Sequence, residues 1–399
     1  MRMVHRVISL IACVVLFYLG VTGSWIQILD IRETLSGAAE ATPVMQSINE
    51  GRYGNMDFAV MTQRDYAAAP LPADLDFHAA FSRVLGALHR SHPGELPTFV
   101  ELRMADGRPI GQARFGQEPR DPRKFAQGVQ AVDVESLKSV PTADIMPVFP
   151  PPSLRQSLKE WHRFWSRHDV PGVWFELLAG VAMWVLIITG LTMYFRLLKQ
   201  RRKINRPGLF WMTSDRWRSL HRAVSLASAV LLVWVAFTGT WLGFESVWHS
   251  LQPRSGNHEI QGLSDGQVLQ MVDETLAGLR KADVQAPIRV LRVRDYWGMK
   301  QGVVITAEPV TRQVIINTAN GSPAGLTEPN YPKSGFPFGI VTHELIKHLH
   351  SGFLFGLWAR IFDLLAGLAL IFLSSSGLVM YLQMYGIRLK SGRRALFWK

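Results

Sequence analysis

Four long apolar stretches dominate the hydropathy pattern of the chain. They cover residues 4–29, 173–198, 220–244 and 353–385. A membrane-spanning helix needs ~20 mostly apolar residues, and each stretch meets that length. The last stretch exceeds one crossing, so we expect it to tilt or to begin outside the hydrocarbon. The pattern therefore predicts an α-helical membrane protein built on a four-helix transmembrane bundle.

The segments between these stretches are mixed in polarity and define the remaining domain organisation. We expect the helices at 1–29, 161–198, 220–245 and 343–385. The second and fourth ranges each include a short segment that precedes the apolar stretch. The connecting parts are two large domains at 30–160 and 246–342, a basic loop at 199–219 and a basic tail at 386–399.

The two large domains show the same order of predicted elements. In the first, an amphipathic helix at 77–89 precedes a strand pair around a turn at 105–108. In the second, a capped helix at 264–279 is followed by strands at 287–294, 302–307 and 313–317. Each domain is therefore expected to be a small α+β fold.

Charge is distributed in a way that orients the chain in a membrane. Only 19% of residues are charged, against roughly 25% in soluble proteins. Residues 1–6, 196–222 and 384–399 hold 16 of the 43 basic residues and one of the 31 acidic residues. Because short loops rich in Lys and Arg face the cytoplasm, we expect both termini there and both large domains in a bacterial periplasm. The net charge of +12 thus reflects contact with the lipid bilayer, not nucleic acid.

The apolar stretches form an internal repeat. The first stretch aligns with the third without a gap, and nine of 24 positions are identical from residue 4 to 27. The second aligns with the fourth in the same way, with ten of 20 identical from 176 to 195. Both copies enter from the same side, so the repeat is parallel and predicts a pseudo-twofold axis along the membrane normal. The first stretch also lacks a clear signal-peptidase site, and we expect it to be retained.

Histidines occupy matched positions in the two copies. His5 matches His221 at one membrane face, and His162 matches His350 near the other. A twofold axis would bring each pair together, and two neutral imidazoles suit haem iron inside a helix bundle. The single cysteine, Cys13, excludes a thiolate ligand set. The alternatives are His168 for His162, and His343 or His348 for His350; a histidine at a helix end can also simply reach the lipid headgroups.

Glycines accompany these histidines at similar depths. Gly23, Gly190, Gly239 and Gly377 each follow a threonine or serine. A helical rise of about 1.5 Å per residue places Gly23 and Gly239 near the outer histidines, and Gly190 and Gly377 near the inner ones. They could make room for a flat macrocycle or serve as helix-packing contacts. The adjacent arginines Arg6 and Arg222 could neutralise haem propionates or act as topology anchors.

Several of these motifs resemble the PepSY-associated transmembrane-helix family. The similarity lies in the Leu-His-Arg and Thr-Gly-Thr-Trp motifs at 220–222 and 238–241, and in Trp-His-Arg at 161–163. The region ending at 317–321 resembles the PepSY-like domain of that family, with Asn317 where aspartate is usual. The resemblance covers nearly the whole chain. It implies two PepSY-like periplasmic domains, b-type haem and, as in bacterial inner-membrane ferrisiderophore reductases, reduction of iron(III) chelates.

The expected function is therefore a di-haem b electron conduit in the inner membrane. It would be an oxidoreductase that passes electrons to a ferric siderophore or another iron(III) chelate. The largest cytoplasmic loop, at 196–222, is too short to hold a nucleotide-binding domain, so a membrane quinol or an unidentified partner must donate the electrons. The alternatives are a siderophore or peptide transporter, and a haem-free PepSY signalling or assembly protein.

Overall fold

The computed structural model separates the chain into two compact units. It describes residues 1–37, 69–116, 128–141, 153–164, 171–206, 208–213, 215–251, 262–296, 299–307, 313–323 and 336–398. The first unit is a helical bundle, made of Met1–Ala38, Pro152–Gln252 and Leu345–Lys399. The second holds the strands, and is made of Ala39–Pro151 and Pro253–Glu344.

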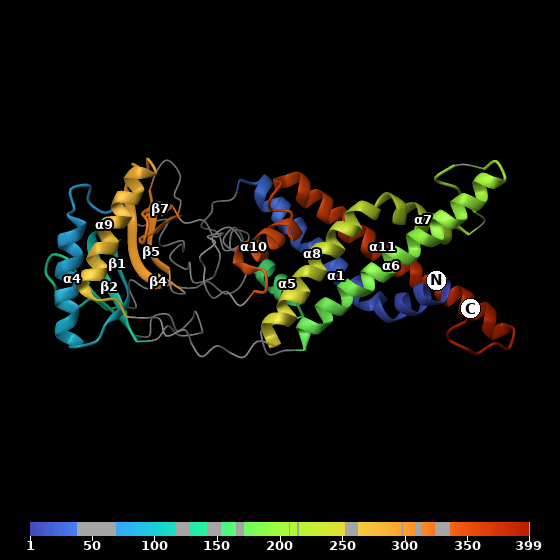
Figure 1. Cartoon of the computed structure of the whole chain (residues 1–399), viewed down its shortest axis with the longest axis horizontal. Helices are drawn as coiled ribbons and strands as arrows, with labels where there is room; N and C mark the ends of the chain where they lie inside the picture. Colours follow the sequence, from blue (N-terminus) through green and yellow to red (C-terminus); the bar gives the residue numbers. More distant parts are fainter. Residues whose placement is uncertain are drawn as a thin grey trace. The chain divides into compact units, whose positions relative to one another are not determined.

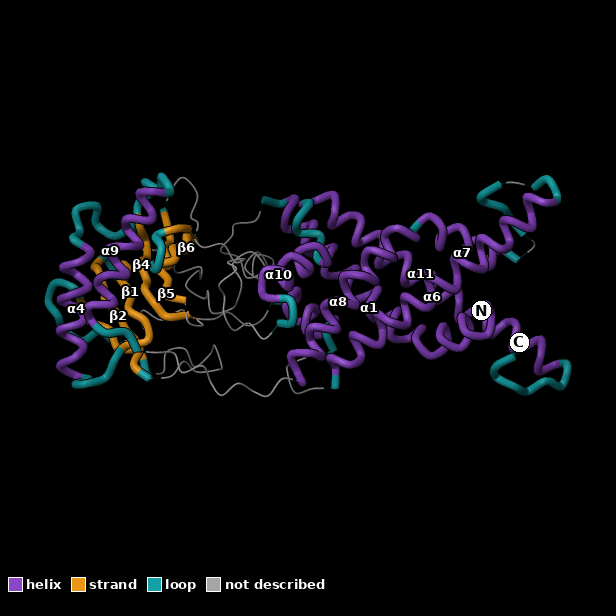
Figure 2. Tube along the Cα trace, viewed as in Figure 1, coloured by secondary structure: helices purple, strands orange, loops and turns teal. Residues whose placement is uncertain are grey.

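Four helices of the bundle are long and apolar enough to cross a membrane. They are α1 (Arg2–Leu35), α6 (Gly172–Lys203), α8 (Ala229–Leu251) and α11 (Gly356–Lys390). The two chain ends lie at the same end of the bundle, and its described elements are helical (Figures 1 and 2). These helices agree with the four predicted spans and identify a membrane protein.

Small residues bring these helices together in two pairs. Helix α1 packs along α11, and α6 packs along α8. Gly367 lies against the Ser24 hydroxyl in the first pair, and Gly180 lies against the Thr240 hydroxyl in the second, so neither position has room for a Cβ. The two contacts occur at positions that the sequence repeat matches. Close backbone approach at small residues is a usual source of helix association in membranes.

The third predicted span is interrupted in the structure. Helix α7 (Arg216–Ala227) precedes α8, and Ser228 separates them. The Ser228 hydroxyl donates to the carbonyl of Val224 at 2.7 Å, a back-bond that commonly bends helices. The helical region begins at residue 216, earlier than predicted, because Asp215 caps α7 through the Arg218 N–H (3.3 Å). Two short helices, α5 (Leu154–His162) and α10 (Gly339–His350), precede α6 and α11.

The second unit packs two helices on one face of a seven-stranded antiparallel sheet. Helices α4 (Phe77–Ser91) and α9 (Asp265–Lys281) lie beside each other (Figure 1). The strands are β1 (Pro97–Ala105), β2 (Arg108–Phe115), β3 (Val129–Asp133), β4 (Ile288–Tyr296), β5 (Met299–Thr306), β6 (Gln313–Asn317) and β7 (Ser322–Pro323). Most of these elements match the predicted ones. Strands β3 and β7 and helices α5 and α10 were not predicted.

The structure joins in one sheet what the sequence predicts as two separate domains. The strand order is β3-β2-β1-β4-β5-β6-β7, and the β1–β4 pair connects the two halves. At the centre of that pair, Glu101 lies opposite Arg292, and the Arg292 Nε donates to the Glu101 carboxylate at 2.6 Å. Without this pairing, β1 and β4 would each be an exposed sheet edge. The merger therefore removes two edges and forms one apolar core under α4 and α9.

Candidate functional site

The outer histidine pair is assembled from the two short helices. His162 is the last residue of α5 and His350 is the last residue of α10. Their ring centres are 6.4 Å apart and their planes are inclined by 39°. Burial lowers the pKa of His162 to about 3 and the pKa of His350 to about 4. Both imidazoles are therefore neutral at ordinary pH and keep a lone pair for a ligand.

A hydroxyl group on a neighbouring helix orients each outer imidazole. The Nδ1 of His162 lies 2.8 Å from the Thr22 hydroxyl on α1, and the Nδ1 of His350 lies 2.9 Å from the Thr238 hydroxyl on α8. Each hydroxyl donates its own proton to a carbonyl one turn earlier in its helix, at 2.9 Å in both cases. With its proton directed to that carbonyl, the hydroxyl oxygen is placed to accept a proton from the Nδ1 of the imidazole. This arrangement corresponds to the tautomer with Nε2 unprotonated in both rings.

The inner histidine pair repeats this arrangement at the opposite end of the bundle. The Nδ1 of His5 lies 2.8 Å from the Thr189 hydroxyl of α6, and the Nδ1 of His221 lies 2.8 Å from the Ser376 hydroxyl of α11. These hydroxyls also donate to carbonyls of their own helices, at 2.6 and 3.3 Å. The same kind of imidazole–hydroxyl contact is thus repeated at all four histidines.

Each of the four glycines directly follows the hydroxyl residue that contacts an imidazole. Each glycine therefore lies next to the same imidazole ring. A Cβ on Gly23 would come within 3.2 Å of the His162 ring, and one on Gly239 within 3.4 Å of the His350 ring. The corresponding distances are 3.4 Å from Gly190 to His5 and 3.8 Å from Gly377 to His221.

The glycines therefore lie directly against the imidazoles. The contact of a macrocycle with these glycines, expected from the sequence, stays a prediction. The role of the preceding hydroxyl residue was not predicted, although the fourfold Thr/Ser-Gly pattern was its signal.

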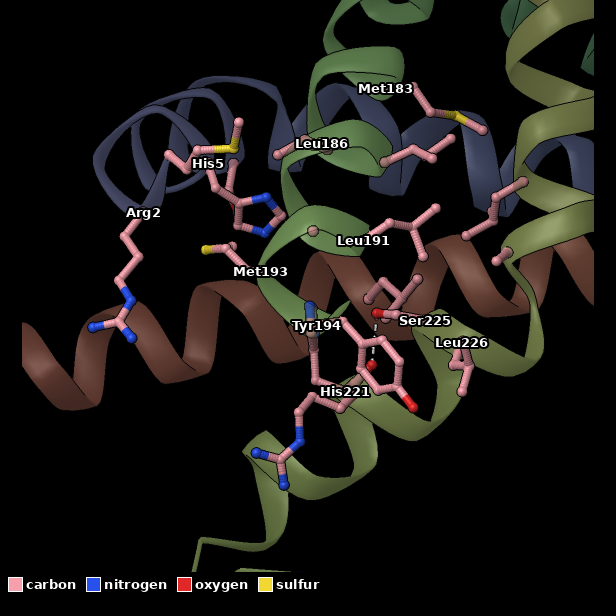
Figure 3. Close-up of a pocket in the computed structure, with 18 of the residues that line it drawn as sticks. Arg2, His5, Met183, Leu186, Leu191, Met193, Tyr194, His221, Ser225 and Leu226 are labelled. Carbon is pink, nitrogen blue, oxygen red and sulfur yellow. Dashed lines mark hydrogen bonds between the residues drawn. The ribbon is translucent and has the colours of Figure 1, made fainter. Parts of the chain in front are cut away.

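A large apolar cavity connects the two inner histidines. Its volume is about 920 Å³, within the range of ligand pockets. Figure 3 shows His5 and His221 at its wall, together with Met183, Leu186 and Leu191 of α6. Arginine side chains at the same wall come from Arg2, Arg196 and Arg222. The cavity therefore offers two imidazoles, an apolar body and cationic groups.

The structure gives Arg6 and Arg222 additional contacts. Arg6 donates to the Trp398 carbonyl at 2.8 Å, and Arg222 donates to the Trp211 carbonyl at 3.3 Å. Arg222 also lines the cavity, whereas Arg6 is not among its lining residues. A role in neutralising propionates therefore suits the position of Arg222 better than that of Arg6.

The alternative histidines have other neighbours. His343 stacks on Phe336 with ring centres 3.8 Å apart, and His348 lies 5.0 Å from the Phe353 ring. His168 lies outside the described residues. The pair that the structure brings together at the outer end is thus His162 and His350.

A buried charge network near the outer end was not predicted either. Asp30 on α1 accepts from the Nε of Arg155 at 2.6 Å and pairs with the Nη1 of Arg360 at 3.1 Å. All three side chains are buried. The sequence repeat gave no signal for it, because residue 246, which matches Asp30, is a serine. The network ties α1, α5 and α11 together beside the outer pair.

The donor set suits a group that needs only two protein ligands per site. Within the described ranges, no cluster of three or more His, Cys, Asp or Glu side chains could hold a bare metal ion. A pair of neutral imidazoles would leave the other coordination positions to the group itself, as haem iron requires.

Comparison with known proteins agrees with the membrane fold. No curated protein matches this chain. The profile described as the PepSY-associated TM region matches residues 2–383. Because this match covers nearly the whole sequence, the chain belongs to the family of proteins with a PepSY-associated TM region.

Proposed function

We propose that the bundle holds two haem b groups and that the protein is an electron conduit of the bacterial inner membrane. In this proposal His5 and His221 hold the inner haem, and His162 and His350 hold the outer one. The acceptor is a periplasmic iron(III) chelate, most simply a ferric siderophore. The observation that carries the proposal is the fourfold imidazole–hydroxyl contact, which prepares four Nε2 atoms as ligands in two pairs.

The geometry of the outer pair supports this assignment. The ring centres of the outer pair are 6.4 Å apart, which leaves space for one metal ion that each imidazole would bind through a nitrogen at about 2 Å. Histidines that ligate metals nearly always donate their second ring N–H to a fixed acceptor. The hydroxyls of Thr22 and Thr238 are such acceptors.

The remaining residues orient the ligands and exclude water. Bound haem supplies one-electron chemistry, and the protein tunes it through ligand basicity and burial. The hydroxyl that accepts each Nδ1–H raises the electron density at Nε2 and holds the ring plane. Met183, Leu186 and Leu191 make the inner site apolar. The two pairs lie at opposite ends of one bundle, as a path across a membrane requires. A membrane quinol or an unidentified partner would deliver the electrons.

A reduced-minus-oxidised absorption spectrum of the purified full-length protein tests the proposal. We expect b-type bands from two haems per chain and reoxidation of the reduced protein by a ferric siderophore. Protein purified from haem-replete cells without such bands would contradict the haem assignment. If the bands of the reduced protein persist after a ferric siderophore and other iron(III) chelates are added, the haem assignment stands. An iron(III) chelate is then excluded as the electron acceptor.

Replacing Thr189 by valine should weaken the inner site selectively. The substitution removes the acceptor of the His5 Nδ1 proton, and loss of such a contact typically reduces metal affinity by about 10–100-fold. Haem retention and a redox titration measure the effect, and the inner potential should rise because the ligand becomes less basic. The control is Thr192→Val, since Thr192 bonds only a carbonyl of its own helix (2.6 Å) among the described contacts. Equal behaviour of the two variants would argue against the positioning role.

A further inference from the structure

The sequence match between the second and fourth spans continues past the apolar stretches. A Leu-Phe-Trp segment occupies residues 209–211 and occurs again at 396–398, at the same offset that relates the two spans. The first segment follows α6 and the second follows α11. Both therefore lie at the end of the bundle that carries the chain termini (Figure 1).

A tyrosine fixes each segment to the helix before it. The Tyr194 hydroxyl donates to the Leu209 carbonyl at 2.7 Å, and Tyr194 stacks on Trp211 with ring centres 5.6 Å apart. In the second copy, Tyr381 donates to the segment's first carbonyl at 2.9 Å and stacks on Trp398 at 5.8 Å. The segments are thus held in the same way.

Two guanidinium groups lie against each tryptophan ring. Arg201 and Arg222 each lie 4.6 Å from the centre of the Trp211 ring. The second copy places Arg6 and Arg388 at 4.1 and 4.4 Å from the Trp398 ring. The two arginines of each pair carry the same charge and repel one another.

These guanidinium groups have unused hydrogen-bonding capacity. The Nε atoms of Arg201, Arg222 and Arg388 are buried and have no hydrogen-bond acceptor within the described part of the chain. Convergent arginines with free N–H groups are the usual receptor for a phosphate, which they bind in a bidentate manner. Each segment therefore holds two arginines beside one tryptophan, which is the donor composition of an anion site.

Apolar side chains surround these anion sites. Leu209 and Phe210 are 51% and 59% exposed, and Leu396 and Phe397 are 54% and 38% exposed. They lie next to the points where α6 and α11 end, in the most basic part of the sequence. A free phosphate ion would use only the guanidinium groups. A phospholipid would use both the charged and the apolar parts.

We propose that each Leu-Phe-Trp segment, with its two arginines, binds one anionic phospholipid of the adjacent leaflet. The lipid phosphate lies on the guanidinium pair, and the upper acyl chain lies against the leucine and phenylalanine. The negative surface of the leaflet draws the basic segments towards it. The chain thus carries two lipid sites, related by its repeat, and in the first of them Arg222 also belongs to the wall of the inner cavity.

Native mass spectrometry of the full-length protein tests this proposal. With phosphatidylglycerol we expect up to two retained lipids per chain. Arg201→Gln and Arg388→Gln should each weaken lipid retention at one site by about fivefold or more, and the double variant should show this loss at both sites. The matched controls are Arg202→Gln and Lys390→Gln, because both side chains are exposed neighbours that make none of the described contacts with either tryptophan. Both controls should bind like the unmodified protein.

Three results would overturn the proposal. The first is lipid retention by the Arg201→Gln/Arg388→Gln double variant equal to that of the unmodified protein. The second is equal retention of phosphatidylcholine, which would show that charge is not recognised. The third is displacement of the lipid by equimolar inorganic phosphate, which would make the sites phosphate sites only. Helical circular dichroism of each variant verifies that the bundle is folded.

Discussion

Replacing His350 by alanine is expected to remove about half of the bound haem and to abolish reduction of ferric chelates. The outer site depends on two imidazoles whose ring centres are 6.4 Å apart, and an alanine leaves one of the two ligand positions empty. The inner haem should remain, because His5 and His221 lie at the other end of the bundle. The amplitude of the b-type difference spectrum per chain measures the loss, and a redox titration should show one potential where the unmodified protein shows two.

A neighbouring histidine supplies the matched control for this experiment. His348 lies in the same helix, two residues before His350, and its ring lies 5.0 Å from that of Phe353. His348→Ala should keep both haems. If His348→Ala loses the outer haem while His350→Ala keeps it, His348 is the outer ligand in place of His350. The proposed electron conduit is not affected by that change. If both variants keep full absorbance, the outer pair does not bind haem.

The sequence could predict which histidines come together because their positions repeat; their role as haem ligands stays a prediction. Matched histidines, and a glycine after a hydroxyl residue, occur in both copies, so the symmetry of the repeat alone pairs positions that are distant in the chain. The residues that directly contact each imidazole were less predictable. The imidazole of His162 fills the space at Gly23, because the short helix α5 turns its last residue into the bundle. That turn depends on packing and leaves no local pattern in the sequence.

The interruption of the third span and the buried network around Asp30 show the same limit. Residues 220–244 have the pattern of one apolar stretch, yet a single side-chain bond from Ser228 to the Val224 carbonyl accompanies the break. Asp30 resembles an ordinary residue at the end of a span, and only the folded chain places Arg155 and Arg360 against it. Such contacts join residues that are far apart in the chain, so neither periodicity nor composition could predict them.

The joining of the two sheet halves also escaped prediction, for a physical reason. Alternation of apolar and polar residues identifies a strand and its two faces, but it does not indicate which other strand pairs with it. The polar face of β1 and β4 explains the choice. Glu101 is fully buried there, accepts from Arg292 at 2.6 Å and from Gln112 at 2.6 Å, and pairs with Arg103 at 2.8 Å. A carboxylate between arginines of both halves specifies this register.

Replacing Glu101 by glutamine should therefore destabilise the strand-containing unit strongly. The side chain keeps its shape but loses the charge that compensates buried guanidinium groups on both halves of the sheet. Breaking a buried ion pair from one side typically costs about 3–5 kcal/mol. Pulse proteolysis of the full-length protein in urea reports the unfolding of this unit, and its midpoint should fall by more than about 1 M. The haem spectrum of the bundle should not change.

Glu95→Gln is the matched control, because Glu95 precedes β1 and its side chain is exposed. It removes the same charge from the same region and should leave the urea midpoint within the error of measurement. If the Glu101→Gln variant is as stable as this control, the Glu101 carboxylate is not needed to hold β1 against β4. In that case the backbone pairing, and not the carboxylate, would unite the two halves, and substitutions that weaken the β1–β4 hydrogen bonds would have the larger effect.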